Sequence, residues 1–358
     1  MAHLFIPGPT DVAPEILAAQ THRMIGHRSP ACTDLFARIQ PRLRRVLQTN
    51  HRVFITASSG SGLQEAALRN TVRRRALVCI GGAFGERWFD VAQANGLPAD
   101  RLDVDWGRPH DPQQVADALR RHAYDAVALV HNETSTGVEN PVAAIAEAVR
   151  QASPETLILV DAVSSAGGVD IQTDNWGLDV LLTSSQKCFA LPPGLAFAAV
   201  SDRALQQATR VPHRGWYFDF LLLERYQQQN NTPATPAISL LFALDAQLDR
   251  ILIEGLPARF ARHARMAHLT EAWALERMAL LAPEGFRSKT VTAVVHDRRL
   301  DVAALIAHLA SRDMAIASGY GSLREMTFRI GHMGEIQPAD VELLLGAIDG
   351  YLAGQPAR

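Results

Sequence analysis

The chain has 358 residues, of which 47% are hydrophobic and 20% charged, and its formal net charge is −2. This balance is typical of a globular protein with one large or two smaller domains, and it disfavours a nucleic acid or an anionic membrane as partner. The longest apolar runs have strand length, too short for a bilayer-spanning helix. With three widely spaced cysteines and no leader-like pattern, we expect a reducing, cytoplasmic compartment without disulfides.

The first two thirds of the sequence alternates short apolar runs with helical patterns. The predicted strands are 53–56, 76–80, 126–130, 156–160, 179–183 and 195–200, and helices begin near residues 63, 86, 112 and 142. Because these strands are apolar on both faces, they indicate a mostly parallel sheet covered by helices on both sides. The last two strands leave no room for a helix between them and are expected to be neighbours joined by a loop.

The final third is predicted to be mostly helical before a small α+β unit. Residues 237–281 form a long helical stretch interrupted at 255–257. Beyond it, strands are expected at 291–295 and 327–330, and helices at 302–310 and 338–352. We therefore divide the chain into an N-terminal segment (1–20), a large domain (21–255), and a linking helix with a small C-terminal domain (256–358).

A Ser/Gly-rich loop, Thr56–Gly62, lies between a predicted strand and the following helix. Free N–H groups at a helix N-terminus bind phosphate, and Ser59 and Ser61 add hydroxyls. The same pattern also fits an ordinary turn. It lacks the glycine spacings of dinucleotide-binding folds and P-loops.

Two further strand ends carry charged side chains. Asp161 ends an apolar strand, at the sheet edge where ligands bind, and there it would pair with a cationic ring nitrogen or a metal, or cap a turn. Lys187 follows the next strand among uncharged neighbours. A desolvated amine of this kind has the lowered pKa that Schiff-base chemistry requires, although a surface lysine is the alternative.

Polar and basic residues complete the candidate site. The segment His131–Gly137 follows a strand and should lie at the same edge as Asp161. Arg329 lies inside an apolar strand, where it would bind a substrate carboxylate or an internal acid. The 13 histidines show no metal-ligand spacing, so no metal site is expected.

The order of these features resembles the fold-type I pyridoxal-phosphate (PLP) enzymes. More narrowly, the chain resembles the class V aminotransferases, the group that includes the alanine– and serine–glyoxylate (or –pyruvate) enzymes. The resemblance extends from about residue 4 to 352. The matching segments are Phe5–Thr10, Met24–Ser29, Ser59–Gly62, Glu65–Leu68, Glu133–Gly137, Val160–Ser165, Ser185–Lys187, Pro192–Gly194 and Phe328–Gly331.

The resemblance implies a mostly parallel, mixed seven-stranded sheet with flanking helices, and a role for each site residue. Lys187 matches the lysine that forms the Schiff base and moves the substrate proton, and Asp161 matches the acid at the pyridine nitrogen. The N-terminal segment is expected near the active site. Further cofactor contacts are implied for Ser59, Gly60, Ser61, Phe84, Thr134, Gln186, Asn231 and Thr232, and substrate contacts for Gly8, Arg28 and Arg329.

The implied reaction is ping-pong transamination through the pyridoxamine phosphate form. A small amino acid, alanine or serine, would be the donor, and glyoxylate or pyruvate the acceptor. Residues 231–235 resemble a segment that reaches the partner's cofactor phosphate, which implies a homodimer with active sites at the interface. Phosphoserine or 2-aminoethylphosphonate aminotransferases are the alternatives. A cysteine desulfurase is disfavoured because no cysteine follows Cys188, and a silent PLP-binding regulator because Lys187, Asp161 and Arg329 are all present.

Overall fold

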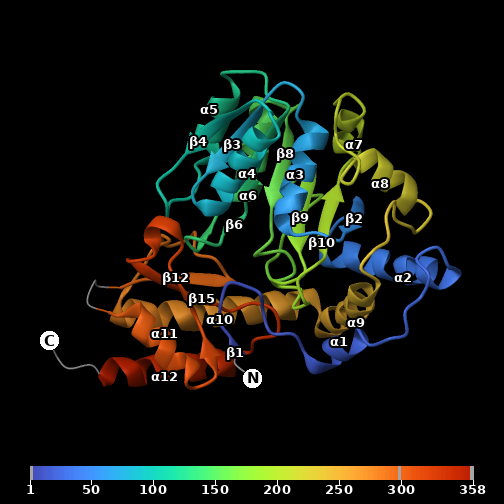
Figure 1. The fold of residues 1–358 in the computed structure, drawn as a ribbon. Coiled ribbons are helices and arrows are strands. Elements are labelled where there is room, and N and C mark those ends of the chain that lie inside the picture. The colour runs from blue at the N-terminus through green and yellow to red at the C-terminus, as the bar shows by residue number, and fades with distance from the viewer. Residues whose placement is uncertain (1–2, 297–299, 355–358) are drawn as a thin grey trace.

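A computed structural model describes residues 3–296 and 300–354 and centres on a seven-stranded sheet (Figure 1). Its order is β2-β10-β9-β8-β5-β3-β4. Strand β10 runs opposite to the other six strands, which all point in one direction. The mixed sheet and the adjacent β9 and β10 are as predicted. The strands are β2 (Arg52–Thr56), β3 (Ala76–Ile80), β4 (Ala99–Asp103), β5 (Ala126–Val130), β8 (Leu157–Asp161), β9 (Val180–Ser184) and β10 (Ala196–Val200).

The edge strand β4 is not predicted by the sequence pattern. Its residues include Asp100, Arg101 and Asp103, and none of its five residues is buried. An edge strand has one neighbour and leaves side chains in solvent, so it needs no continuous apolar run. The rule that finds buried parallel strands therefore misses it.

Helices cover both faces of the sheet, each over its own apolar layer. One face carries α1 (Pro14–Ala19), α2 (Pro30–Val46), α5 (Pro112–Leu119), α6 (Val142–Ala152) and α9 (Ile238–Glu254). The other carries α3 (Gly60–Thr71), α4 (Ala83–Ala94), α7 (Asp202–Ala208) and α8 (Phe220–Gln227). Successive strand residues point to opposite faces, which is why strands buried on both sides are apolar throughout.

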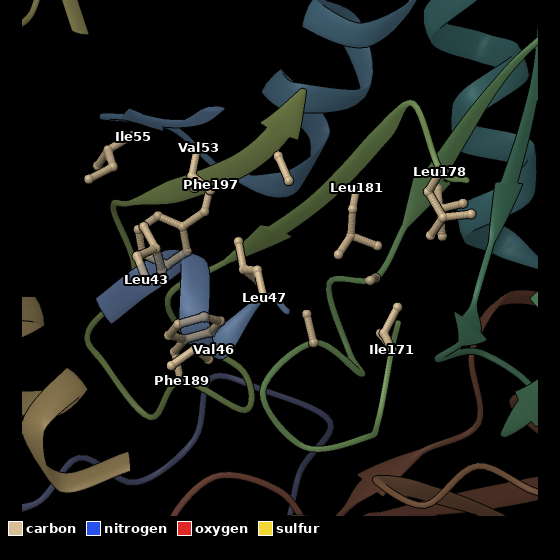
Figure 2. Close-up of a cluster of buried hydrophobic side chains, with 14 of the residues drawn as sticks. Leu43, Val46, Leu47, Val53, Ile55, Ile171, Leu178, Leu181, Phe189 and Phe197 are labelled. Atoms are coloured by element: carbon tan, nitrogen blue, oxygen red, sulfur yellow. The ribbon is translucent and has the colours of Figure 1, made fainter. Parts of the chain in front are cut away.

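Figure 2 shows part of the first layer, where the end of α2 packs against the sheet. Leu43, Val46 and Leu47 lie beneath Val53 of β2 and Phe197 of β10. All five side chains are at most 2% exposed. Burying a side chain of this size contributes about 1.5–3 kcal/mol, so this layer fixes the sheet beneath the loops that follow its strands.

A second, smaller sheet lies below the first in Figure 1 and has its own apolar core. Its order is β11-β12-β15-β14, entirely antiparallel. Helix α10 follows α9 after a break at Gly255, as predicted. The elements are α10 (Leu256–Arg277), β11 (Ala279–Leu280), β12 (Val291–Val295), α11 (Val302–Ala310), β14 (Ala317–Ser318), η1 (Gly321–Leu323), β15 (Thr327–Gly331) and α12 (Pro338–Ala353).

The N-terminal segment runs from the smaller sheet towards the loops of the larger one. Strand β1 (His3–Leu4) pairs in parallel with β13 (Met314–Ala315), and Gly331 N–H donates to the Phe5 carbonyl. Thr10 then bonds to the backbone of Gln186 and Lys187. The domain boundaries given above stay a prediction. Across the described residues, no helix has the length and apolarity needed to cross a bilayer.

Candidate active site

Five loops meet at the edge where the parallel strands end. They follow β2, β3, β5, β8 and β9. Ser59, Thr134 and Lys187 lie in the segments after β2, β5 and β9, Phe84 lies in the first turn of the helix after β3, and Asp161 is the last residue of β8. Because these five strands run in the same direction, their carboxyl ends share one edge, where open α/β sheets bind ligands. Residues distant in the sequence thus form one candidate site.

The Lys187 amine is buried beside the N-terminal segment. Its Nζ donates a hydrogen bond to the Pro7 carbonyl, and no carboxylate forms an ion pair with it within residues 3–296 and 300–354. Burial lowers the pKa of Lys187 to about 8. A Cβ on Gly8, whose φ is +95°, would lie within 2.8 Å of Cδ, Cε and Nζ of this lysine. Glycine there lets the chain approach an amine suited to nucleophilic chemistry.

Asp161 is a buried carboxylate at the end of β8. Gln64 Nε2 donates to its Oδ2 (2.7 Å), and the Val163 N–H donates to its Oδ1 (2.8 Å). Burial raises the pKa of Asp161 to about 6, although both hydrogen bonds act in the opposite direction. No cation forms an ion pair with it in the described part of the chain. A cationic ligand group would relieve this cost.

The loop after β2 leads directly into the N-terminus of α3. The helix begins at Gly60, three residues earlier than predicted, and Ser59 caps it without a side-chain hydrogen bond. A Cβ on Gly60 would lie 2.4 Å from Val163, so only glycine lets the helix approach the loop after β8. Ser61 Oγ accepts a bond from Arg87 Nη1 (3.1 Å). The first turn of a helix attracts anions, so this corner suits a phosphate.

The Gln186 side chain adds a polar group to the site. Its backbone carbonyl accepts from Thr10 N–H (3.2 Å), which fixes the residue beside Lys187. Its buried Oε1 has no hydrogen-bond partner among the described residues. Buried amides are rarely left without a partner, so a ligand group is a natural one here.

Phe84 is held at the site by a buried carboxylate, Glu133. The Phe84 and Gly85 N–H groups donate to it (both 3.1 Å), so Glu133 caps the N-terminus of α4. Ser135 Oγ also donates to it (2.5 Å). Burial raises the pKa of Glu133. A Cβ on Gly82 would lie 2.5 Å from the carboxyl carbon. Glu133 was not among the predicted site residues, although an acid shortly after an apolar strand could have indicated it.

Thr134 and Arg329 join the two sheets at the site. Thr134 lies between the short strands β6 (Asn132–Glu133) and β7 (Val138–Glu139), and its Oγ1 shares a hydrogen bond with Ser164 Oγ (2.5 Å). Arg329 Nη1 donates to the Thr134 carbonyl (3.2 Å), and its Nε donates to the Ser318 carbonyl (3.1 Å).

The guanidinium of Arg329 forms no ion pair with an acid of the described chain. The side chain is 8% exposed, and burial lowers its pKa. No carboxylate forms an ion pair with it in residues 3–296 and 300–354. The internal salt bridge that was the alternative for this arginine is therefore absent from the part of the chain that is described. A buried guanidinium without an acid needs an anionic ligand.

Arg28, Asn231 and Thr232 form a separate group. Arg28 donates to the Asn231 side chain, to the Thr232 carbonyl (2.6 Å) and to the Pro233 carbonyl (3.1 Å). Within the described chain, none of these bonds links the three residues to Lys187 or Asp161. Their expected contacts with substrate and cofactor stay predictions.

The site fits PLP in its donor set. It combines a helix N-terminus for a phosphate, a buried acid without a cation, an aromatic ring and a desolvated amine. Among the described residues, no three His, Cys, Asp or Glu side chains lie together as a metal site would require.

Comparisons with known proteins agree with this fold and site. Residues 15–334 match the family described as aminotransferase class-V. The L-aspartate–glyoxylate aminotransferase of Paracoccus denitrificans is 35% identical, over 94% of this chain and 87% of the relative. The serine–glyoxylate aminotransferase of Methylorubrum extorquens is also 35% identical, over 97% and 89%. The solved alanine–glyoxylate aminotransferase of Nostoc sp. superimposes with a TM-score of 0.92 at 31% identity, over 98% and 95%.

The fold is that of the fold-type I PLP enzymes. Within that class, the chain belongs to the class V aminotransferases. It is therefore a PLP-dependent aminotransferase, which confirms the resemblance noted in the sequence.

Proposed function

We propose that the enzyme transfers the amino group of a small α-amino acid, alanine or serine, to glyoxylate or pyruvate. The observation that carries the proposal is Arg329, a buried guanidinium with no acid in the described chain. A guanidinium binds a carboxylate through two parallel hydrogen bonds, and both amino donors and 2-oxo acids carry a carboxylate. The two relatives named for serine and alanine with glyoxylate support this choice of substrates.

We assign the handling of the substrate proton to Lys187. PLP, when bound, supplies a ring that withdraws electrons from the substrate's α-carbon. Lys187 would hold PLP covalently, and its Nζ would accept and return the substrate's α-proton. With a pKa of about 8, this amine both accepts and releases protons near neutral pH.

We assign the remaining cofactor contacts from the family resemblance, supported by the position of these residues at one edge of the sheet. Asp161 would hold the protonated ring nitrogen, and that cation would lower the cost of the buried carboxylate charge. Phe84 would cover one face of the ring, and Thr134 would hold the phenolic oxygen. The phosphate is assigned to Ser59, Gly60, Ser61 and Gln186.

Two copies are proposed to share their active sites. In the described chain, Asn231 and Thr232 make no hydrogen bond to Ser59, Gly60 or Ser61, and Thr232 lines a hollow together with Trp216 and Tyr217. These two aromatic side chains are 61% and 44% exposed, which favours burial against a second copy. Sedimentation should show a dimer, and specific activity should fall on dilution below its dissociation constant. A fully active monomer contradicts this.

We also propose a cytoplasmic location. Cys32, Cys79 and Cys188 are all buried free thiols, and proteins in reducing compartments keep such thiols.

Arg329→Lys is expected to raise the KM for the amino donor about 10- to 100-fold. The lysine keeps the charge but loses one of two parallel hydrogen bonds, and a bond to a charged group is worth about 1.5–3 kcal/mol. The dissociation constant for PLP, from absorbance titration, should stay unchanged. Arg324→Lys, an exposed arginine just before β15, is the matched control. An unchanged KM in Arg329→Lys would remove the carboxylate role.

A donor–acceptor panel tests the substrate proposal directly. Alanine, serine, aspartate, phosphoserine and 2-aminoethylphosphonate are offered as donors, each with glyoxylate, pyruvate and 2-oxoglutarate. We expect the highest kcat/KM with alanine or serine and either glyoxylate or pyruvate. If 2-aminoethylphosphonate, which has no carboxylate, were best, the role of Arg329 would be wrong. No exchange with any donor would favour the silent PLP-binding alternative.

A further inference from the structure

Tyr320 contacts both Phe84, which is assigned to the cofactor ring, and Arg329, which is assigned to the substrate carboxylate. Its ring centroid is 5.9 Å from that of Phe84, and the Arg329 Cζ lies 5.3 Å from the ring of Tyr320. The side chain is half-buried, so part of the ring faces open space. Phe84 lies in the first turn of α4, on the large sheet, and Tyr320 lies in the loop after β14, so the Tyr320 ring lies between the two sheets beside the arginine.

The backbone around Tyr320 is firmly held. Gly319 N–H donates to the Thr327 carbonyl (2.8 Å), and the Tyr320 carbonyl accepts from Leu323 N–H (3.0 Å) in the turn η1. A Cβ on Gly319 would lie 2.1 Å from the Leu323 carbonyl oxygen, so the chain is closely packed there. Arg329 Nε donates to Ser318, two residues before the tyrosine. The backbone that carries the ring is therefore fixed relative to the guanidinium, and the ring bounds the space beside it. We call this boundary the wall.

We propose that the ring of Tyr320 limits the length of the amino acid side chain that the site accepts. The inference rests on the proposed function, in which Arg329 binds the substrate α-carboxylate. The α-carbon is one bond from that carboxylate, so the side chain leaves it within reach of the rings beside the guanidinium. Alanine and serine add one and two heavy atoms there. A longer chain meets the ring.

The ring, and not the hydroxyl, is the limiting feature. The Tyr320 hydroxyl makes no hydrogen bond within residues 3–296 and 300–354. Tyr320→Phe therefore keeps the wall, and Tyr320→Ala removes it. One methylene in an apolar pocket changes the specificity about 10- to 200-fold, so the removal is measurable.

The test compares kcat/KM for alanine and for 2-aminopentanoate, a straight-chain donor two methylenes longer, in the PLP-loaded enzyme. In Tyr320→Ala we expect the ratio of the longer donor to alanine to rise tenfold or more. In Tyr320→Phe it should stay within about threefold of the parent. Tyr351→Ala is the control for general loosening, because it removes a half-buried ring of α12 that packs against His308 of α11.

Binding of straight-chain carboxylates gives a second readout that needs no turnover. Propanoate and hexanoate are titrated calorimetrically into the holoenzyme, and Tyr320→Leu replaces Tyr320→Ala if the latter does not fold. If Tyr320→Ala gains more affinity for hexanoate than for propanoate, the result supports the proposed wall. An unchanged preference, or an equal change in Tyr320→Phe, overturns it. Failure of transamination with intact carboxylate discrimination would instead contradict the proposed function alone.

Discussion

Replacing Lys187 by alanine is expected to abolish covalent attachment of PLP and to lower transamination by about 10⁴-fold. The variant loses both the amine that holds the cofactor and the base that moves the α-proton. Since burial lowers the pKa of this lysine, removing it also removes the cost of a desolvated amine, and the fold should persist. Visible absorbance of the purified protein and a coupled turnover assay measure the two losses.

The chain offers a sharp control for this variant, because its only other lysine is Lys289. That side chain is 44% exposed and forms an ion pair with Glu139. Lys289→Ala should keep both the absorbance band and the activity. A Lys187→Ala protein with an undiminished band and rate would contradict the assignment.

Asp161→Asn is expected to lower kcat about 100- to 1,000-fold while PLP remains bound, because a neutral amide no longer stabilises a protonated ring nitrogen. The amide should fit. Gln64 donates to Asp161 through Nε2, and its Oε1 has no partner in the described chain, so the Gln64 amide can rotate to accept. Burst and steady-state rates measure the effect. Turnover near that of the parent would remove the ring-nitrogen role.

The same substitution is expected to stabilise the apoprotein. The folded pKa of Asp161, about 6, is raised above its ordinary value of 3.8. An acid whose pKa is raised by folding destabilises the folded state when it is ionised. This loss of stability is absent below about pH 4 and fully present above about pH 6. At pH 8, Asp161→Asn should raise the free energy of unfolding by up to roughly 3 kcal/mol. Calorimetry of the apoprotein at pH 8 measures this. A less stable variant would mean that burial of the ionised carboxylate does not destabilise the folded protein.

The large sheet could be predicted because its central strands are buried on both faces. Runs such as Ala126–Val130 and Leu157–Asp161 are apolar throughout, which only a covered parallel sheet allows. Strand β4 could not be predicted from apolar runs, because an edge strand tolerates charged residues. The α3 start at Gly60 was placed too late, because helix propensity disfavours glycine while close packing against Val163 requires it.

The site was predictable where chemistry is local to a strand end. Asp161, Lys187 and Arg329 are unusual in their own sequence neighbourhoods, since each is a charge next to an apolar run. Glu133 and Tyr320 both contact Phe84, which is far from each of them in the sequence, and no local pattern reveals such contacts. The contacts of Arg28 with residues 231–233 likewise depend on the tertiary fold.

The covalent attachment of PLP to Lys187 is tested most directly by borohydride reduction of the holoenzyme and peptide mass mapping. Borohydride reduces a carbon–nitrogen double bond between PLP and an amine to a stable single bond. With only two lysines in the chain, the label has just two side-chain positions to choose between. We expect it on the peptide that contains Lys187 and on no other. Label on Lys289, or reduced protein without label on either lysine, would contradict the account.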